Sequence, residues 1–161
     1  MRVIVLLAAL AGPVAAQELV FSSDAVEQCM AVNTDPRQCI GASANACMQA
    51  TDGGETTVGM GGCLGREWQF WDTRLNAVYK QAMSGAKSID AELEDLGSSA
   101  PKQAPALRDM QRAWISFRDA KCDFERSQWG GGTGGGPATV ACLMSTTGEQ
   151  TLYLQAMRLG E

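Results

Sequence analysis

The sequence contains no histidine, and this absence removes several classes of catalytic site. Histidine is the usual general base, the partner of serine and cysteine nucleophiles, and the commonest metal ligand. Most hydrolase mechanisms are therefore excluded. A carboxylate pair of the glycosidase type and a serine-lysine dyad stay open, but the chain has no motif typical of either. We expect a protein that is not an enzyme and that holds no metal or other cofactor.

The sequence also lacks a hydrophobic run long enough to cross a bilayer, which takes about 20 residues. The apolar run at 3–11 follows Arg2 and precedes small residues at 13–16, the layout of a secretory signal peptide. We expect residues 1–16 to be a signal peptide cleaved after Ala16. The mature protein is then predicted to be periplasmic or secreted, without insertion into the membrane.

Basic residues are few: the chain has 13 lysines and arginines against 18 acidic residues, a net charge of −5. Proteins that bind nucleic acid display basic patches, so we expect no nucleic-acid partner. An acidic surface favours a cationic partner through electrostatic steering, although it also serves solubility alone. The sequence indicates no oligomeric state.

All six cysteines follow the predicted cleavage site, and an even number in an exported chain predicts disulfides. A zinc site is the competing interpretation, but there is no Cys-x-x-Cys pair and the expected compartment is oxidising. The number of cysteines leaves their pairing open. They are Cys29, Cys39, Cys47, Cys63, Cys122 and Cys142.

Capping signals and apolar periodicity predict helices in the first half of the chain. Asn33 to Asp35 before Pro36 predict a short helix from Pro36 towards Ala50. A loop at 51–57 follows, in which Thr56 or Thr57 could cap the next helix. From Leu64 to Ala86, apolar residues in steps of four and three predict a long amphipathic helix. Glycines at 59, 61, 62 and 65 would fray or bend its start unless Cys63 holds it.

The second half of the chain predicts two more helices. Residues 89–96 could continue the long helix or form a turn, before a polar break at 97–105. A helix from about Ala106 to Ser127 carries charges on an outer face that we expect to be solvated. The glycine-rich segment 129–137 predicts a flexible loop, without the Gly-Lys-Ser/Thr ending of a phosphate-binding loop. A last helix is predicted from Pro137 to Gly160. The apolar stripe of the helix ending at Ser127 is Leu107, Met110, Trp114, Phe117 and Phe124.

No segment alternates with the period of a strand. We therefore predict an all-α fold, a small antiparallel bundle of about four helices stapled by disulfides.

Two stretches form a recognisable combination. In the first, Cys63 precedes the pattern D-x-x-L-N-x-x-Y at 72–79, and in the second Q-R-x-W-x-x-F-R-D-x-x-C occupies 111–122. A glycine-rich loop and Cys142-Leu143 follow. This combination resembles the LprI-type lysozyme-inhibitor N-terminal domain family, small exported helical modules, over roughly 47–154. Thr146 and Gln150 depart from the leucine and arginine that members often carry.

The resemblance implies disulfides between Cys47 and Cys63 and between Cys122 and Cys142, which leaves Cys29 with Cys39. It also implies the domain organisation. After the signal peptide, residues 17–46 are an N-terminal extension with a short helix, and residues 47–161 are the LprI-like helical domain.

Several motif residues are predicted to form a structural polar network. Asp72, Asn76 and Tyr79 recur one helical turn apart, and Arg118 lies in a comparable stripe on the next helix. We expect the two faces to meet, with Arg118 paired to Asp72 or Asn76, because a guanidinium suits bidentate pairing with a carboxylate. The alternative is that Arg118 and Asp119 are exposed.

The resemblance implies binding, and inhibition, of a cationic lysozyme or another peptidoglycan-lytic enzyme. Inhibition needs an acidic body and a loop that reaches into a substrate groove. The loops at 52–57 and 130–137 adjoin predicted disulfides, so their ends would be held. The expected contacts are Asp52, Glu55, Trp129 and Thr133.

Two other functions compete. One is a non-catalytic cell-envelope scaffold with a different partner, for which an exposed patch of Trp68, Phe70 and Trp129 would mark the interface. The other is a glycan-cleaving enzyme, which needs two facing carboxylates. Glu67 and Asp72 lie five residues apart on the predicted helix and point to different sides.

Overall fold

The computed structural model describes residues 18–157, so the predicted signal peptide and its cleavage site lie outside the described residues. The described part consists of five α-helices and one short 3-10 helix, and it contains no strand. The predicted all-α class is confirmed. The elements are α1 (Asp24–Val32), η1 (Pro36–Cys39), α2 (Ala42–Ala50), α3 (Thr57–Asp95), α4 (Gln103–Ser127) and α5 (Gly135–Ala156).

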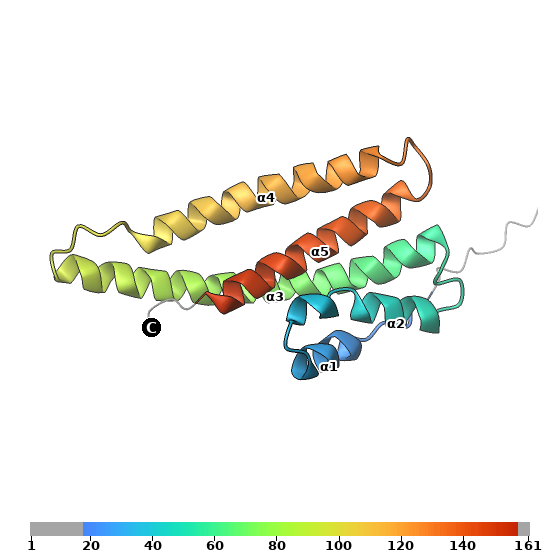
Figure 1. The fold of residues 1–161 in the computed structure, drawn as a ribbon, viewed down its shortest axis with the longest axis horizontal. Coiled ribbons are helices and arrows are strands. Elements are labelled where there is room, and N and C mark those ends of the chain that lie inside the picture. The colour runs from blue at the N-terminus through green and yellow to red at the C-terminus, as the bar shows by residue number, and fades with distance from the viewer. Residues whose placement is uncertain (1–17, 158–161) are drawn as a thin grey trace, which may run out of the picture.

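The three long helices form an elongated antiparallel bundle. Helices α3 and α4 run in opposite directions, and α5 lies between them in the view of Figure 1. α5 packs most extensively against α3 and next against α4, whereas α3 and α4 contact each other less. α1, η1 and α2 cover the first half of α3 (Figure 1). Within residues 18–157, no helix is both long and apolar enough to cross a membrane.

α3 begins earlier than its apolar periodicity predicts, despite its glycines. It starts at Thr57, and the Oγ1 of Thr56 accepts a hydrogen bond of 3.1 Å from the Gly59 N–H, as a capping residue should. Gly59 is buried against the preceding loop, where a Cβ would collide with the backbone of Gly53 and Gly54. The helix then continues unbroken to Asp95, so residues 89–95 extend it.

The prediction of one continuous helix from Pro36 to Ala50 is wrong, because the segment is divided into η1 and α2. The chain leaves the 3-10 helix η1 after Cys39, and Gly41 has a φ of +99°, which other residues rarely adopt, before α2 starts at Ala42. α1 is an addition to the predicted helices. Its sequence signal is weak because its single fully buried residue is Val26.

The core has two clusters. The first is formed where α1, η1 and α2 meet α3 and α5, and Val26, Trp71 and Leu152 belong to it. The second joins the three long helices and includes Leu75, Leu107 and Leu154. Because residues of α1 and η1 are fully buried in the first cluster, this N-terminal segment is an integral part of the core.

The stripe predicted for α4 is buried only in part. Leu107 is buried, but Phe117 and Phe124 are 60% and 65% exposed. α4 has the fewest buried residues of the three long helices, because its neighbours cover it along a narrow line. α5 also differs from its prediction, since it begins at Gly135 and ends at Ala156, with Met157 in an extended conformation.

Candidate functional site

The three disulfides pair as the resemblance implied, and the described residues include no free cysteine. Cys29 is bonded to Cys39, Cys47 to Cys63 and Cys122 to Cys142, with Cα–Cα distances of 5.5, 5.6 and 5.4 Å. The second bridge spans the loop between α2 and α3, and the third spans the loop between α4 and α5. Both loops predicted as partner contacts are therefore anchored covalently next to their ends.

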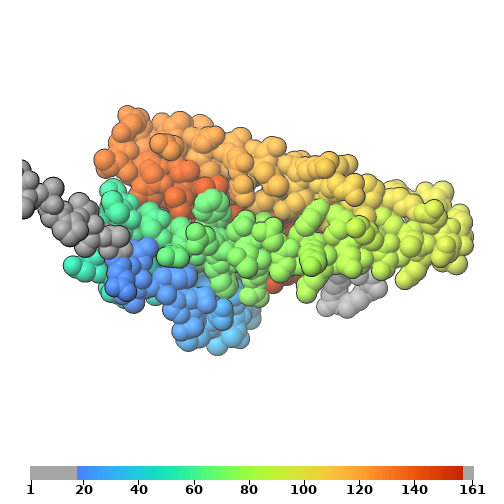
Figure 2. All heavy atoms as spheres, turned by 180° about the vertical axis from the view of Figure 1, so that it is seen from behind, coloured from blue at the N-terminus to red at the C-terminus, as the bar shows by residue number. Residues whose placement is uncertain are grey.

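The two loops lie at the same end of the molecule. We name this end the loop end and define it as residues 51–58 and 122–136. Figure 1 shows the α2–α3 connection and the α4–α5 connection at one extremity, next to the start of α3, and Figure 2 shows the same grouping from behind. Segments about 75 residues apart in sequence thus form one surface region.

The α2–α3 loop has a tightly held backbone. The hydroxyl of Thr56 donates to the Gly53 carbonyl at 2.7 Å, and the hydroxyl oxygen of Thr51 accepts from the Val20 N–H at 2.9 Å. Gly54 is buried against the backbone of Met48, where no Cβ would fit. The loop therefore presents its exposed side chains, Asp52 and Glu55, from a fixed backbone.

The α4–α5 loop folds around Trp129. Gly130 and Gly131 have φ values of +54° and +85°, and the Gly132 N–H donates to the Trp129 carbonyl at 2.8 Å. The indole lies against Gly134, where a Cβ would overlap its ring, and the residue is 52% exposed. A cavity of about 320 Å³ lies beside it, lined in part by Asp123 and Arg126. Thr133 is exposed on the same loop.

The loop end is acidic. Exposed carboxylates come from both of its segments, and Arg126 is the single basic residue within 51–58 and 122–136. At close range these charges favour a cationic surface. Val58, Phe124 and Trp129 add exposed apolar area. The carboxylates are Asp52, Glu55, Asp123 and Glu125.

The expected pairing of Arg118 with Asp72 or Asn76 is wrong. Arg118 donates from Nε and Nη2 to Asp119 at 2.9 and 2.7 Å, and its guanidinium lies 5.1 Å from the centre of the Trp114 ring. Asp72 instead accepts from the Asn76 amide at 3.1 Å on its own helix.

The reason for this difference is that α5 lies between the predicted faces of α3 and α4, so polar groups of both helices contact α5. On one side, the Gln150 amide donates to Gln111 of α4, and on the other the Thr151 hydroxyl donates to the Trp71 carbonyl of α3. Tyr79 packs against the second core cluster. The Arg118 side chain is only 15% exposed, whereas that of Asp119 is 54% exposed, so the alternative of two exposed residues holds for Asp119 alone.

Trp68 and Phe70 do not extend an exposed patch from Trp129. Both are partly buried and pack against the first core cluster, and the Phe70 ring meets the Trp71 ring edge-on at 5.2 Å. Trp129 is therefore the aromatic residue of the predicted patch that stays exposed.

Glu67 is a buried structural carboxylate, a role that was not predicted from the sequence. It is fully buried and accepts hydrogen bonds from the Gly41 N–H, the Ala44 N–H and the Trp71 indole at 2.6, 2.7 and 2.9 Å. The carboxylate thus caps the start of α2 from the side. Its position between Leu64 and Trp71, inside an apolar stripe, was the available signal.

Asp90 has a similar role at the opposite end of α3. It accepts from the N–H groups of Gln103 and Ala104 at 2.6 and 2.9 Å and so caps α4. Burial alone would raise the pKa of Asp90, but the hydrogen bonds from these two N–H groups and the charge of Lys102 outweigh it and lower the pKa.

Lys102 strengthens this second cap. Its Nζ donates to the Asp90 carbonyl at 2.9 Å and to Glu94 at 2.8 Å. This hydrogen bond and the charge of Lys102 lower the pKa of Glu94, against the opposing effects of burial and of Asp90.

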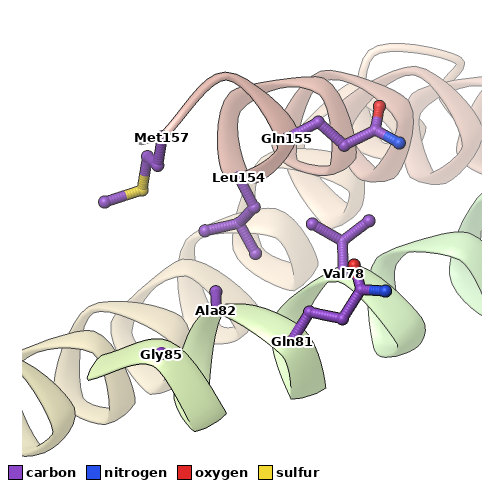
Figure 3. Close-up of a pocket in the computed structure, with 7 residues that line it drawn as sticks. All are labelled: Val78, Gln81, Ala82, Gly85, Leu154, Gln155 and Met157. Atoms are coloured by element: carbon purple, nitrogen blue, oxygen red, sulfur yellow. The ribbon is translucent and has the colours of Figure 1, made fainter. Parts of the chain in front are cut away.

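A separate groove lies where α5 ends and α3 continues. Figure 3 shows the Leu154 side chain pointing towards Val78 and Ala82, with Met157 beyond it at the end of the groove, whose volume is about 470 Å³. The remaining lining residues, Gln81, Gly85 and Gln155, add no ionisable group. The groove offers no catalytic chemistry. Across residues 18–157, no cluster of three histidine, cysteine or acidic residues could hold a metal ion.

Comparison with known proteins identifies relatives of this chain. The family model of lysozyme inhibitor LprI matches residues 47–154. An uncharacterized 17.7 kDa protein of Rhodobacter capsulatus is 28% identical over 160 residues, covering 97% of this chain and 96% of that protein. The uncharacterized protein YecT of Escherichia coli is 27% identical, covering 71% of this chain and 73% of its own length. No solved structure matches the chain.

Proposed function

The chain belongs to the lysozyme inhibitor LprI family, and from this membership we propose that it binds a cationic lysozyme, or another cationic enzyme that cleaves peptidoglycan, and blocks its substrate cleft. The protein acts outside the cytoplasm, in the periplasm or after secretion, where disulfides persist. It is a binding protein and not an enzyme. Its contact surface is the loop end.

One observation carries this proposal: two loops from distant parts of the chain lie at the same end, each next to a disulfide (Figure 1). A loop whose backbone is already fixed loses little conformational entropy when it binds. Two such loops at one end of the molecule can contact the same partner together.

The side chains of the loop end suit a cationic partner. The carboxylates of Asp52 and Glu55 are exposed and steer a basic protein towards the loops. Trp129, 52% exposed and packed on its own loop, supplies a rigid apolar anchor of the kind that dominates interface energies. The exposed hydroxyl of Thr133 adds a hydrogen-bonding group on the same loop.

The first test is lysis of peptidoglycan by a cationic c-type lysozyme, with and without the purified, oxidised mature chain. We expect inhibition, and we expect it to disappear after the disulfides are reduced, because the loops then lose their anchors. Absence of inhibition at excess protein would contradict the proposal. It would favour the alternative of a non-catalytic cell-envelope scaffold, whose partner a pull-down would identify.

A pair of charge variants locates the contact surface. Asp52→Asn with Glu55→Gln removes two charges at the loop end, and Glu92→Gln with Asp95→Asn removes two at the far end of α3. The first variant should lower the association rate with lysozyme by about tenfold at low salt, and the second should not. Equal effects of the two variants would exclude the loop end as the steering surface.

A pair of apolar variants tests the anchor. Trp129→Ala should weaken binding by about tenfold or more, whereas Leu96→Ala, at an 82% exposed position at the other end, should leave it unchanged. Trp129→Phe keeps an aromatic ring on the loop and should restore part of the affinity. Undiminished binding by Trp129→Ala would remove this residue from the interface.

A further inference from the structure

A second surface lies halfway along the bundle, away from the loop end, and we propose that it binds a neutral saccharide. It is a cleft of about 330 Å³ between α4 and α5, closed on the other side by η1. This inference does not depend on lysozyme inhibition. The lining residues that carry it are Trp114, Phe117, Glu149, Gln150, Tyr153 and Arg37.

The cleft follows from how three elements meet. α5 contributes residues at 146, 149, 150 and 153, a spacing that places them on one face of the helix. α4 adds aromatic residues along one side, and η1 adds Arg37 on the other. α5 contacts both of these elements, so its exposed face forms the floor of an open groove.

Aromatic residues from both α4 and α5 line the cleft. Phe117 and Tyr153 are 60% and 47% exposed, so a large part of each side chain is not used in packing the core. Trp114 is partly buried, and the guanidinium of Arg118 lies 5.1 Å from its ring centre. The indole also packs against the second core cluster, which restricts its orientation. Flat rings held in place suit the apolar C–H faces of a pyranose.

Gln150 supplies a fixed hydrogen-bond acceptor. The residue is only 7% exposed, and its amide nitrogen donates to Gln111 Oε1 at 3.0 Å and to Met110 Sδ at 3.5 Å. Among the residues that the structure describes, no group donates to its Oε1. This oxygen is not among the fully buried polar atoms that lack a partner, so it faces the cleft's solvent and can accept from a ligand hydroxyl or N–H in place of water.

The charges at the rim indicate a neutral ligand. Glu149 and Arg37, which carry opposite charges, both line the cleft, and Arg37 lies 4.0 Å from the carboxylate of Asp35. An anion would face Glu149, a cation would face Arg37, and a purely apolar peptide would leave the Gln150 oxygen unpaired. A sugar has apolar faces together with hydroxyl donors, and it satisfies all three conditions. The volume is at the small end of ligand pockets and suits a sugar ring with an N-acetyl group.

Calorimetric titration of the oxidised mature chain with chitotriose tests the proposal. We expect saturable binding at millimolar or lower concentrations. Phe117→Ala should weaken it about fivefold to tenfold. The matched control is Ile115→Ala, an exposed apolar residue of the same helix outside both the cleft and the loop end, which should bind as the wild type.

A second pair of variants tests the acceptor. Gln150→Met keeps the volume but removes the oxygen, and it should weaken chitotriose binding, whereas Gln155→Met, on an exposed part of the same helix, should not. If Gln150→Met fails to fold, Tyr153→Ala replaces it as the test. Tyr153 is 47% exposed and lines the cleft, so this variant should fold and should weaken chitotriose binding. Absence of saturable binding, or equal binding by Phe117→Ala and Ile115→Ala, would overturn the proposal. The lysozyme assay is not used here, so the two proposals can fail separately.

Discussion

The loop end and the opposite end of the molecule differ in the contacts that hold them in place. We call the opposite end the hairpin tip, formed by the last turns of α3 from Ala86, the connection at 96–102 and α4 up to Leu107. In each half of the molecule a carboxylate of α3 caps the start of another helix: Glu67, ten residues after the start of α3, caps α2, and Asp90 caps α4 at the hairpin tip. Glu67 is fully buried, whereas Asp90 is 9% exposed and close to Lys102 and Glu94.

The surroundings differ more than the caps do. The loop end contains the α2–α3 and α4–α5 loops, each spanned by a disulfide (Figure 1). The hairpin tip consists of the ends of two helices and their connection, without a disulfide. The comparison teaches that buried polar contacts and disulfides hold the half of the molecule that carries the loop end in one shape. A cap supported only by polar contacts makes the stability of its region sensitive to pH.

The largest effect is expected from removing the buried cap. Glu67→Ala leaves two backbone N–H groups and the Trp71 indole without an acceptor inside the first core cluster, which should cost roughly 3–5 kcal/mol of unfolding free energy. Glu67→Gln keeps one acceptor oxygen and should cost less. Urea unfolding followed by circular dichroism measures both. A loss below about 1 kcal/mol for Glu67→Ala would show that the cap is dispensable.

The next effect concerns the covalent part of the comparison. Replacing Cys47 and Cys63 together by serine opens a 16-residue separation and should lower stability by about 3 kcal/mol. Hydrogen exchange should show the loss of protection first in residues 51–58. If the amides of the hairpin tip were exposed to the same degree, the two ends would not be independent.

A smaller pair of effects separates two neighbouring glycines. Gly59→Ala places a Cβ against the backbone of Gly53 and Gly54 and should destabilise by about 1–3 kcal/mol. Gly61→Ala, where a Cβ meets nothing within 4 Å, should stabilise by up to about 1 kcal/mol through its higher helix propensity. Thermal unfolding measures the pair, and effects of the same sign would contradict the close approach of the loop to α3.

The smallest effect is local and depends on pH. The folded pKa values of Asp90 and Glu94 are lowered from their ordinary values of 3.8 and 4.5. Their contribution is therefore present above those ordinary values, and it is lost as the pH falls through the lower folded values. Amide protection at Gln103 and Ala104 should fall in this acid range before that at the loop end.

Asp90→Asn is the control for this titration. It should weaken protection of the same amides at neutral pH and flatten the remaining pH dependence. Unchanged acid sensitivity in this variant would assign the effect to another group.

Local signals in the sequence were enough for much of the fold. A threonine cap at 56 or 57, the loops around 51–57 and 129–137, and the three long helices were predicted because each depends on residues close in sequence. The disulfide pairs came from the resemblance. The break at Gly41 was missed, because its positive φ is set by the meeting of η1 and α2 with the core.

What could not be predicted depends on the position of α5. This helix lies between α3 and α4, yet much of its buried surface is polar or small, including Thr147, Thr151 and Gly148. Gly148 lies against Ile40, so small residues allow close packing without a hydrophobic stripe. An apolar periodicity therefore did not indicate a central helix, and the partners assigned to Arg118 and the exposure of Phe117 followed incorrectly. Of the candidate site, the loops were predictable, whereas their grouping at one end required the structure.

The order of the disulfides along the chain has a consequence for biogenesis. The bridges join residues 10, 16 and 20 positions apart, and each is complete before the next one begins. In a chain that enters an oxidising compartment with its N-terminus first, every second cysteine to emerge finds its correct partner as the one thiol still waiting. Oxidation can then keep pace with translocation and needs no reshuffling by an isomerase.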